Sequence, residues 1–114
     1  MTHAHLNESF EAELRASAVA VARQMLSRKI SVTEAARQLT RIGHSLGVAL
    51  EGPFLTFVGI DSETDTCPLG PVRAWWGAAA LAREDAERER YEDIVRGSAE
   101  EACWNLIRQF APDV

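Results

Sequence analysis

Apolar residues recur with a helical period along residues 6–30 of the chain. They appear at every third or fourth position between charged residues, and neither glycine nor proline interrupts them. This spacing places the apolar side chains on one face of a helix and the charged side chains on the others. We therefore predict an amphipathic helix from Leu6 to about Ile30, with the apolar stripe Leu6, Phe10, Leu14, Ala18, Val21 and Met25.

A second helix is predicted to begin at Val32. The preceding Ser31 and the Glu34 three residues later have the spacing of a capping box, in which each side chain accepts from the other residue's backbone N–H. The helix is expected to end at Gly47 or at the pair Gly52-Pro53. Gly43 should either weaken this helix or let another backbone come close. The apolar stripe consists of Ala35, Ala36, Leu39, Ile42 and Leu46.

The apolar segment 53–60 does not alternate, so its periodicity does not distinguish a buried helical turn from a buried strand. We predict a short helix, because Pro53 suits the first turn of a helix and a lone strand would have no partner in this chain. A polar loop is expected from Ile60 to Trp76, where a Pro-Leu-Gly-Pro turn stiffens the backbone.

Two more helices are predicted after this loop. The first is a short alanine-rich helix over residues 72–82, and the second is a long one from about Glu84 to Phe110 that continues through Gly97. The whole pattern predicts an all-α fold, a compact bundle of about four to five helices with a long C-terminal helix. At this length we expect a single helical domain over residues 1–114.

The composition is that of an ordinary globular protein, with 46% hydrophobic and 25% charged residues. No apolar run approaches the roughly 18 residues that a membrane span needs. The first residues show no basic start followed by an apolar block, so we expect a cytoplasmic protein that does not bind a membrane.

The charge is unevenly distributed along the chain. Of the formal net charge of −5, residues 1–57 contribute five acidic and six basic residues, whereas residues 58–114 contribute twelve acidic and six basic ones. An acidic surface repels phosphate backbones and favours basic partners. This balance predicts a basic protein as partner and argues against nucleic-acid binding.

The alternating acids Asp61, Glu63 and Asp65 resemble the opening of a calcium-binding loop. That loop requires glycine at its sixth position and glutamate at its twelfth, and here those positions hold Thr66 and Val72. We therefore predict no metal ion at this loop and no cofactor. His3 and His5 have a spacing that metal ligands use, but no thiolate or carboxylate signature accompanies them.

Arg73 and the tryptophans that follow it are expected to hold the loop in place. Arg73 is predicted to pair with one of the three loop acids. Trp75 and Trp76 point about 100° apart on a helix, so we expect at least one of them in the core and its neighbour at an interface. Cys67 and Cys103 are expected to be free thiols, with Cys67 the more exposed.

The loop and its flanks contain a spaced pattern made of Gly52, Phe57, Ile60, Asp61, Ser62, Glu63, Thr64, Asp65, Pro68, Gly70, Arg73 and Trp76. This pattern resembles a group of small all-helical bacterial proteins, among them immunity proteins of polymorphic toxin systems. The resemblance covers about residues 40–106 and implies a cytoplasmic inhibitor whose acidic loop and helix bind one cognate toxin domain, often a basic one.

These observations predict an immunity or inhibitor protein with no catalytic residues, whose partner is a toxin domain; a homo-oligomer is left open. One alternative is a small helical ligand-binding or enzymatic domain that uses the loop from Asp61 to Arg73 together with His44. The third, a helix-turn-helix regulator, is disfavoured because the residues after Ile42 offer no recognition helix. The predicted partner-binding residues are Asp61, Glu63, Asp65, Arg73, Trp75, Glu84, Asp85 and Glu87.

Overall fold

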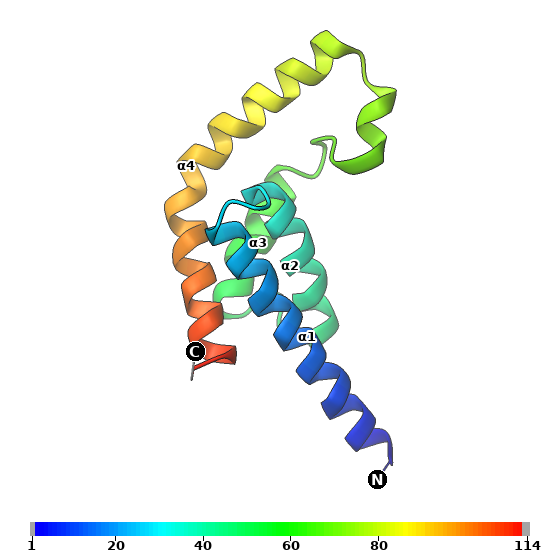
Figure 1. Ribbon diagram of the computed structural model, residues 1–114, viewed down its shortest axis with the longest axis vertical. Coiled ribbons are helices and arrows are strands. Elements are labelled where there is room, and N and C mark those ends of the chain that lie inside the picture. The colour runs from blue at the N-terminus through cyan, green and yellow to red at the C-terminus, as the bar shows by residue number, and fades with distance from the viewer. Residues whose placement is uncertain (1, 113–114) are drawn as a thin grey trace.

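The computed structural model describes residues 2–112, and the side chains of residues 7–112. In chain order its elements are α1 (Thr2–Leu26), α2 (Val32–Leu46), α3 (Gly52–Glu63), the 3₁₀-helix η1 (Gly70–Trp75) and α4 (Ala78–Phe110). No strand occurs within this described range. The predicted all-α fold with a long C-terminal helix is confirmed (Figure 1).

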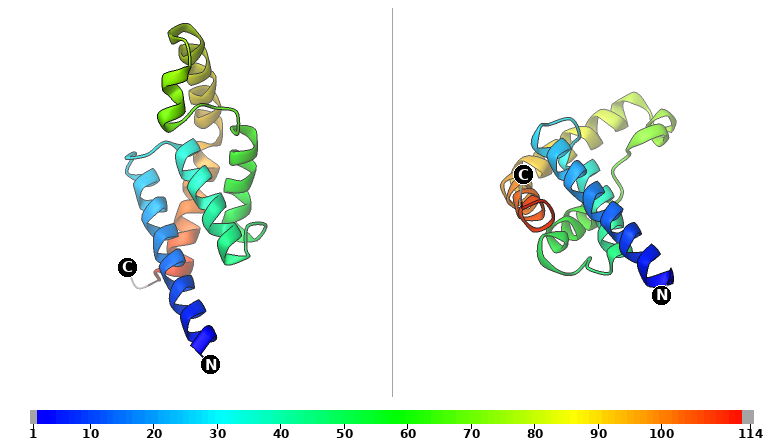
Figure 2. Two further views of the ribbon diagram at one scale, coloured as in Figure 1. Left: turned by 90° about the vertical axis from the view of Figure 1, so that its right-hand side faces the viewer. Right: turned by 60° about the horizontal axis from the view of Figure 1, so that its bottom comes forward.

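The four α-helices pack around one apolar core. α2 packs against α1 and α3, and the C-terminal part of α4 lies against α1 and α3 (Figures 1 and 2). Phe54 of α3 and Phe110 of α4 bring their ring centroids to 6.1 Å. The largest fully buried side chains are Phe54, Phe57, Met25, Leu39, Leu106 and Val32.

Both ends of α2 follow the sequence prediction. The Glu34 backbone N–H donates to Ser31 Oγ at 3.0 Å, and the Glu34 side chain returns to the Ser31 backbone, which completes the capping box. Gly47 ends the helix in the left-handed region with φ 75°. Gly43 permits a close approach, since a Cβ there would lie 2.9 Å from the Phe54 ring and 3.2 Å from Ala49 Cα.

The first helix ends earlier than predicted, at Leu26 rather than near Ile30. Arg28 adopts φ 61°, the left-handed conformation that usually ends a helix on glycine. The backbone N–H groups of Arg28 and Lys29 then donate to the carbonyls of Met25 and Gln24 at 3.0 and 2.8 Å. These bonds satisfy the last carbonyls of the helix, as in a Schellman motif.

The segment 53–60 is helical as predicted, but α3 continues through Glu63. Asp61 and Glu63 are therefore helical residues and not part of a loop. Thr64 caps this helix end, because its buried hydroxyl donates to the Ile60 carbonyl at 2.7 Å.

The predicted boundary between two C-terminal helices is wrong. Residues 70–75 form the 3₁₀-helix, the chain is extended at Trp76 and Gly77, and a single 33-residue helix then runs from Ala78 to Phe110. Alanine is the best helix former, and the charged residues after it also favour a helix, so nothing between residues 78 and 96 stops α4.

The molecule is elongated, with extents of 55 × 28 × 23 Å. The N-terminal part of α4 and η1 extend together beyond one end of the bundle, and the first turns of α1 extend beyond the other (Figures 1 and 2). We call residues 69–87 the arm. No residue of the arm is buried.

Candidate functional site

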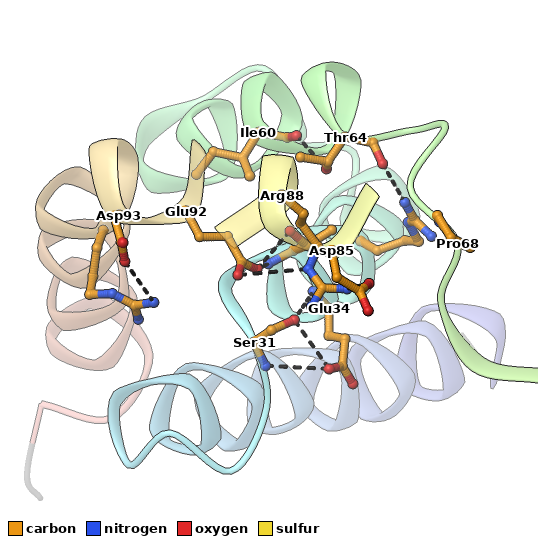
Figure 3. Close-up of polar contacts among 12 residues, drawn as sticks. Ser31, Glu34, Ile60, Thr64, Pro68, Asp85, Arg88, Glu92 and Asp93 are labelled. Atoms are coloured by element: carbon orange, nitrogen blue, oxygen red, sulfur yellow. Dashed lines mark hydrogen bonds and ion pairs between the residues drawn. The ribbon is translucent and has the colours of Figure 1, made fainter. Parts of the chain in front are cut away.

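A network of polar side chains joins the arm to the helical bundle (Figure 3). It connects the N-terminus of α2, the end of α3, the arm and the middle of α4. We call this network the polar joint; it consists of Thr33, Arg37, Thr64, Arg73, Asp85, Arg88 and Glu92.

The carboxylate of Glu92 closes the N-terminus of α2. Its Oε2 accepts from the Thr33 backbone N–H at 2.9 Å and from the Thr33 hydroxyl at 2.7 Å, and the residue is only 4% exposed. The first N–H groups of a helix have no acceptor within the helix, and negative charge is favoured at that end. Because Ser31 already accepts from Glu34, Glu92 and Ser31 serve different N–H groups of α2.

Arg88 lies between two carboxylates on the same face of α4. Its Nε is 3.8 Å from Glu92 Oε1, and its Nη1 is 3.4 Å from Asp85 Oδ1. The Arg88 side chain is 15% exposed. The three residues are spaced by three and four positions, which places them side by side on a helix.

Arg73 fastens η1 to α4. Its two terminal nitrogens donate to both carboxylate oxygens of Asp85 at 2.8 and 2.7 Å, and Nη1 also donates to the Pro68 carbonyl at 3.1 Å. The hydrogen bonds from Arg73 hold the pKa of Asp85 below its ordinary value. This paired geometry sets the orientation of η1 and of the tryptophans beside it.

Arg37 of α2 holds the other side of the joint. It donates to the Thr64 carbonyl at 2.7 Å, and its Nε is 3.5 Å from Asp61 Oδ1. The end of α3 is thereby tied to α2, and the chain leaves it toward the arm.

The predicted partner of Arg73 is therefore wrong. Arg73 pairs with Asp85 of α4, and Asp61 pairs with Arg37 of α2. The loop acids Glu63 and Asp65 are exposed. This difference arises because α3 extends through Glu63. The three acids therefore lie at or just beyond the end of α3 on the bundle, whereas Arg73 lies on the arm.

The expectation that at least one of the paired tryptophans lies in the core is also wrong. Trp75 is 87% exposed and Trp76 is 36% exposed, and Val72 on the same 3₁₀-helix is 48% exposed. The tip of the arm thus presents an aromatic and aliphatic surface to solvent. Trp104, on the body of the molecule, is 50% exposed.

The predicted partner-binding residues fall into two groups in the structure. Arg73, Trp75, Glu84, Asp85 and Glu87 belong to the arm, with Glu84 and Asp85 half-buried and Glu87 exposed. The other three, Asp61, Glu63 and Asp65, lie at the end of α3 and just beyond it. Residues 61–93 contain nine acidic and four basic residues, so this segment carries the whole formal charge of −5.

The groups of the enzymatic alternative are spread over several elements. His44 is exposed in the last turn of α2, in a hollow with Gly47 and Leu50, whereas Asp61 and Arg73 are engaged elsewhere by ion pairs. Asp61 and Arg73 thus serve as structural contacts between elements.

Both cysteines are free thiols. Cys67 is half-buried beside the joint, where burial and the nearby Glu84 raise its pKa. Burial raises the pKa of Cys103 to about 12, and its thiol lies 3.6 Å from Met25 Sδ in the core. A raised pKa leaves a thiol protonated and unreactive at neutral pH.

Neither a metal-binding cluster nor a membrane-spanning helix occurs in the described part of the chain. Among the side chains of residues 7–112, no three histidine, cysteine or acidic residues gather in a way that would hold a metal ion, and the side chains of His3 and His5 lie outside that range. None of the described helices combines the length and the apolar character needed to cross a membrane.

No protein-family model, curated protein or solved structure matches the chain. The resemblance to immunity proteins therefore stays a prediction. The function has to be argued from the arm and its attachment.

Of the polar joint, the sequence predicted only Arg73 and Asp85 as site residues. Thr33, Arg37, Arg88 and Glu92 were not predicted as site residues. The spacing of Asp85, Arg88 and Glu92 is a weak signal, since it predicts contacts along one helix face. It does not predict that Glu92 reaches the N-terminus of another helix.

Proposed function

We propose that the chain is an inhibitor of the immunity-protein kind, which binds a basic toxin domain through the arm. The single observation that carries this proposal is Trp75, which stands 87% exposed on a segment that has no core of its own. Exposed aromatic side chains are frequent anchors of protein–protein interfaces. Val72, Trp75 and Trp76 are the large apolar side chains that the arm exposes to solvent.

The way in which the arm is attached favours a role in partner binding over a purely structural role. The Arg73–Asp85 pair and the Pro68 carbonyl hold η1 in one orientation before any partner arrives. A preformed binding segment loses less conformational entropy on binding than a flexible one. Trp75 is thus presented ready for insertion into an apolar pocket.

The charge of the same region supports a basic partner. The entire net charge of the chain lies in residues 61–93, and the acids Glu63, Asp65 and Glu87 are exposed. Opposite charge around an apolar anchor raises the association rate and excludes unsuitable partners. A basic toxin domain with an apolar pocket fits both properties.

The test uses the product of the neighbouring reading frame as the binding partner, if that product carries a basic domain. We expect Trp75→Ala to weaken binding by about 30-fold or more, as truncation of a central aromatic anchor does. Joint charge reversal at Glu63, Asp65 and Glu87 should weaken binding further and remove most of its salt dependence. Isothermal titration calorimetry measures both effects.

Trp104→Ala is the matched control, because Trp104 is likewise an exposed tryptophan, at 50%, but lies on the body beside Leu26 and Ile107. This variant should bind as the wild-type chain does. Unchanged affinity of the folded Trp75→Ala variant, or equal losses in both tryptophan variants, would refute the arm as the binding surface.

A further inference from the structure

Residues 7–13 of α1 lack a packing partner within the part of the chain that the structure describes. Residues 7–13 are all exposed, and the first fully buried side chain of the described part of the helix is Ala18. Phe10 on this segment is 57% exposed. Isolated helices shorter than about 12–15 residues are marginal in water, so a protruding end gains stability when another surface covers it.

The same face of α1 continues into a groove on the bundle. An open hollow of about 450 Å³ lies between α1 and α2, where Leu14, Ser17, Val21 and Gln24 face Arg41 and Ile42. Phe10 lies one turn before Leu14 in the same row of side chains. Each molecule therefore has one helical segment without a packing partner and one groove, and both lie along the same face of α1.

We propose that the protruding segment of α1 docks into the α1–α2 groove of a second copy, and that the chain forms a symmetric antiparallel dimer. A single two-fold axis lets each copy provide the segment and receive its equivalent at the same time. This proposal does not depend on the proposed function of the arm, which lies at the other end of the molecule (Figure 1).

The spacing along α1 supports pairing of the helix with itself. Asn7, Phe10, Leu14, Ser17, Val21 and Gln24 follow one another at alternating intervals of three and four residues, the repeat of a coiled-coil seam. With the axis between residues 15 and 16, Phe10 lies opposite Val21 of the second copy, and polar Asn7 lies opposite polar Gln24. Leu14 then lies opposite Ser17 near the axis.

Charge complementarity favours a second copy over other occupants. The protruding residues 7–13 carry three acids, Glu8, Glu11 and Glu13, and no base, and Glu11 forms only a solvent-exposed ion pair with Arg15 at 3.7 Å. The one charged residue lining the groove is Arg41, which is exposed and forms no salt bridge within residues 7–112. In the antiparallel arrangement Glu11 of one copy approaches Arg41 of the other.

Sedimentation velocity of the full chain between about 1 and 100 µM tests the proposal, since a dimer with a Kd in that range changes its mass across it. We expect a concentration-dependent dimer of the wild-type chain. Phe10→Asp should raise the dimer Kd by about 100-fold or more, because the substitution enters the interface twice. Leu50→Asp, at a 71% exposed position between α2 and α3, should leave the dimer unchanged.

A charge exchange tests the register of the two helices. Arg41→Glu alone should weaken the dimer, and the double variant Arg41→Glu with Glu11→Arg should restore it. A wild-type chain that stays monomeric at the highest concentration would overturn the proposal. The binding partner of the protruding segment would then be a different protein. A dimer that persists in Phe10→Asp would place the interface elsewhere.

Discussion

At the scale of single residues, Glu92 shows how the fold keeps a charge inside the molecule. Burial of an isolated carboxylate costs several kcal/mol, and this cost is offset only by hydrogen bonds and opposite charge. Glu92 has both, since Thr33 donates twice to Oε2 and Arg88 lies 3.8 Å from Oε1. One side chain thus caps α2 and fixes the point at which α4 leaves the bundle.

Removal of this carboxylate should strongly destabilise the fold. In Glu92→Ala, the Thr33 N–H would stay buried without its acceptor and the Arg88 guanidinium would lose one of its two carboxylate partners, so we expect the free energy of unfolding to fall by about 3–5 kcal/mol. Glu92→Gln retains an oxygen acceptor and should lose less. Urea denaturation followed by circular dichroism measures both values, and a loss below about 0.5 kcal/mol in the alanine variant would contradict this role.

Replacement of Gly43 and of Gly59 by alanine should change the stability of the protein in opposite directions. A Cβ at Gly43 would clash with the Phe54 ring and the Ala49 backbone, so Gly43→Ala should cost about 1–3 kcal/mol. At Gly59 on α3 the space is open, and Gly59→Ala should stabilise the protein by roughly 0.5–1 kcal/mol through helix propensity. Thermal melting of both variants checks the contrast, which fails if both shift the midpoint in the same direction.

At the scale of elements, the arm is a helix and a 3₁₀-turn that hold each other without an apolar core. The first residues of α4 are alanine-rich and favour a helix by themselves. The two pieces of the arm are joined by the Arg73–Asp85 pair, which also accounts for the low pKa of Asp85. The position of Trp75 therefore depends mainly on the contacts of one side chain, Arg73, with Asp85 and with the Pro68 carbonyl.

Acid should release the arm before it unfolds the bundle. Because the folded pKa of Asp85 is lowered, its contribution is complete above the unfolded value and is lost as pH falls below about 4. In a Trp104→Phe background, both remaining tryptophans lie on the arm, and their fluorescence anisotropy should fall in this range. Asp85→Asn should give the low anisotropy already at pH 7.

Asp93→Asn is the control for the acid experiment, because Asp93 is exposed and its pair with Arg96 lies at 4.0 Å, outside the arm. Its anisotropy at pH 7 should equal that of the unsubstituted background. An Asp85→Asn variant with the same anisotropy as this control would show that other contacts hold the arm.

At the scale of the whole molecule, the two ends of an elongated bundle have different characters. One end carries the arm with the exposed Trp75, and the other carries the unpartnered segment of α1 (Figures 1 and 2). The core lies between them. Self-association at one end and partner binding at the other would not compete for the same surface, and a dimer would present two arms.

The helices themselves were largely predictable, because their signals are local. The capping box at Ser31 follows from residues three positions apart, and Gly47 was one of the two helix ends that the sequence offered. For Gly43 the sequence left two roles open, and the neighbouring Phe54 of α3 decides between them. The same kind of helix end at Arg28 was missed, since its left-handed conformation is imposed on a residue that does not signal it. The start of α4 was also missed, because the break falls at Gly77 and not after the alanines.

The candidate site was only partly predictable for a related reason. Helix propensity, capping and charge depend on residues close together in the chain, so the all-α bundle, its long last helix and its acidic second half could be predicted from the residues alone. The pairing of Arg73 with Asp85, the capping of α2 by Glu92 and the exposure of Trp75 and Trp76 became evident only in the folded structure. These outcomes depend on the direction that the chain takes after the end of α3. Composition does not distinguish a tryptophan that packs in the core from one that lies on an exposed arm.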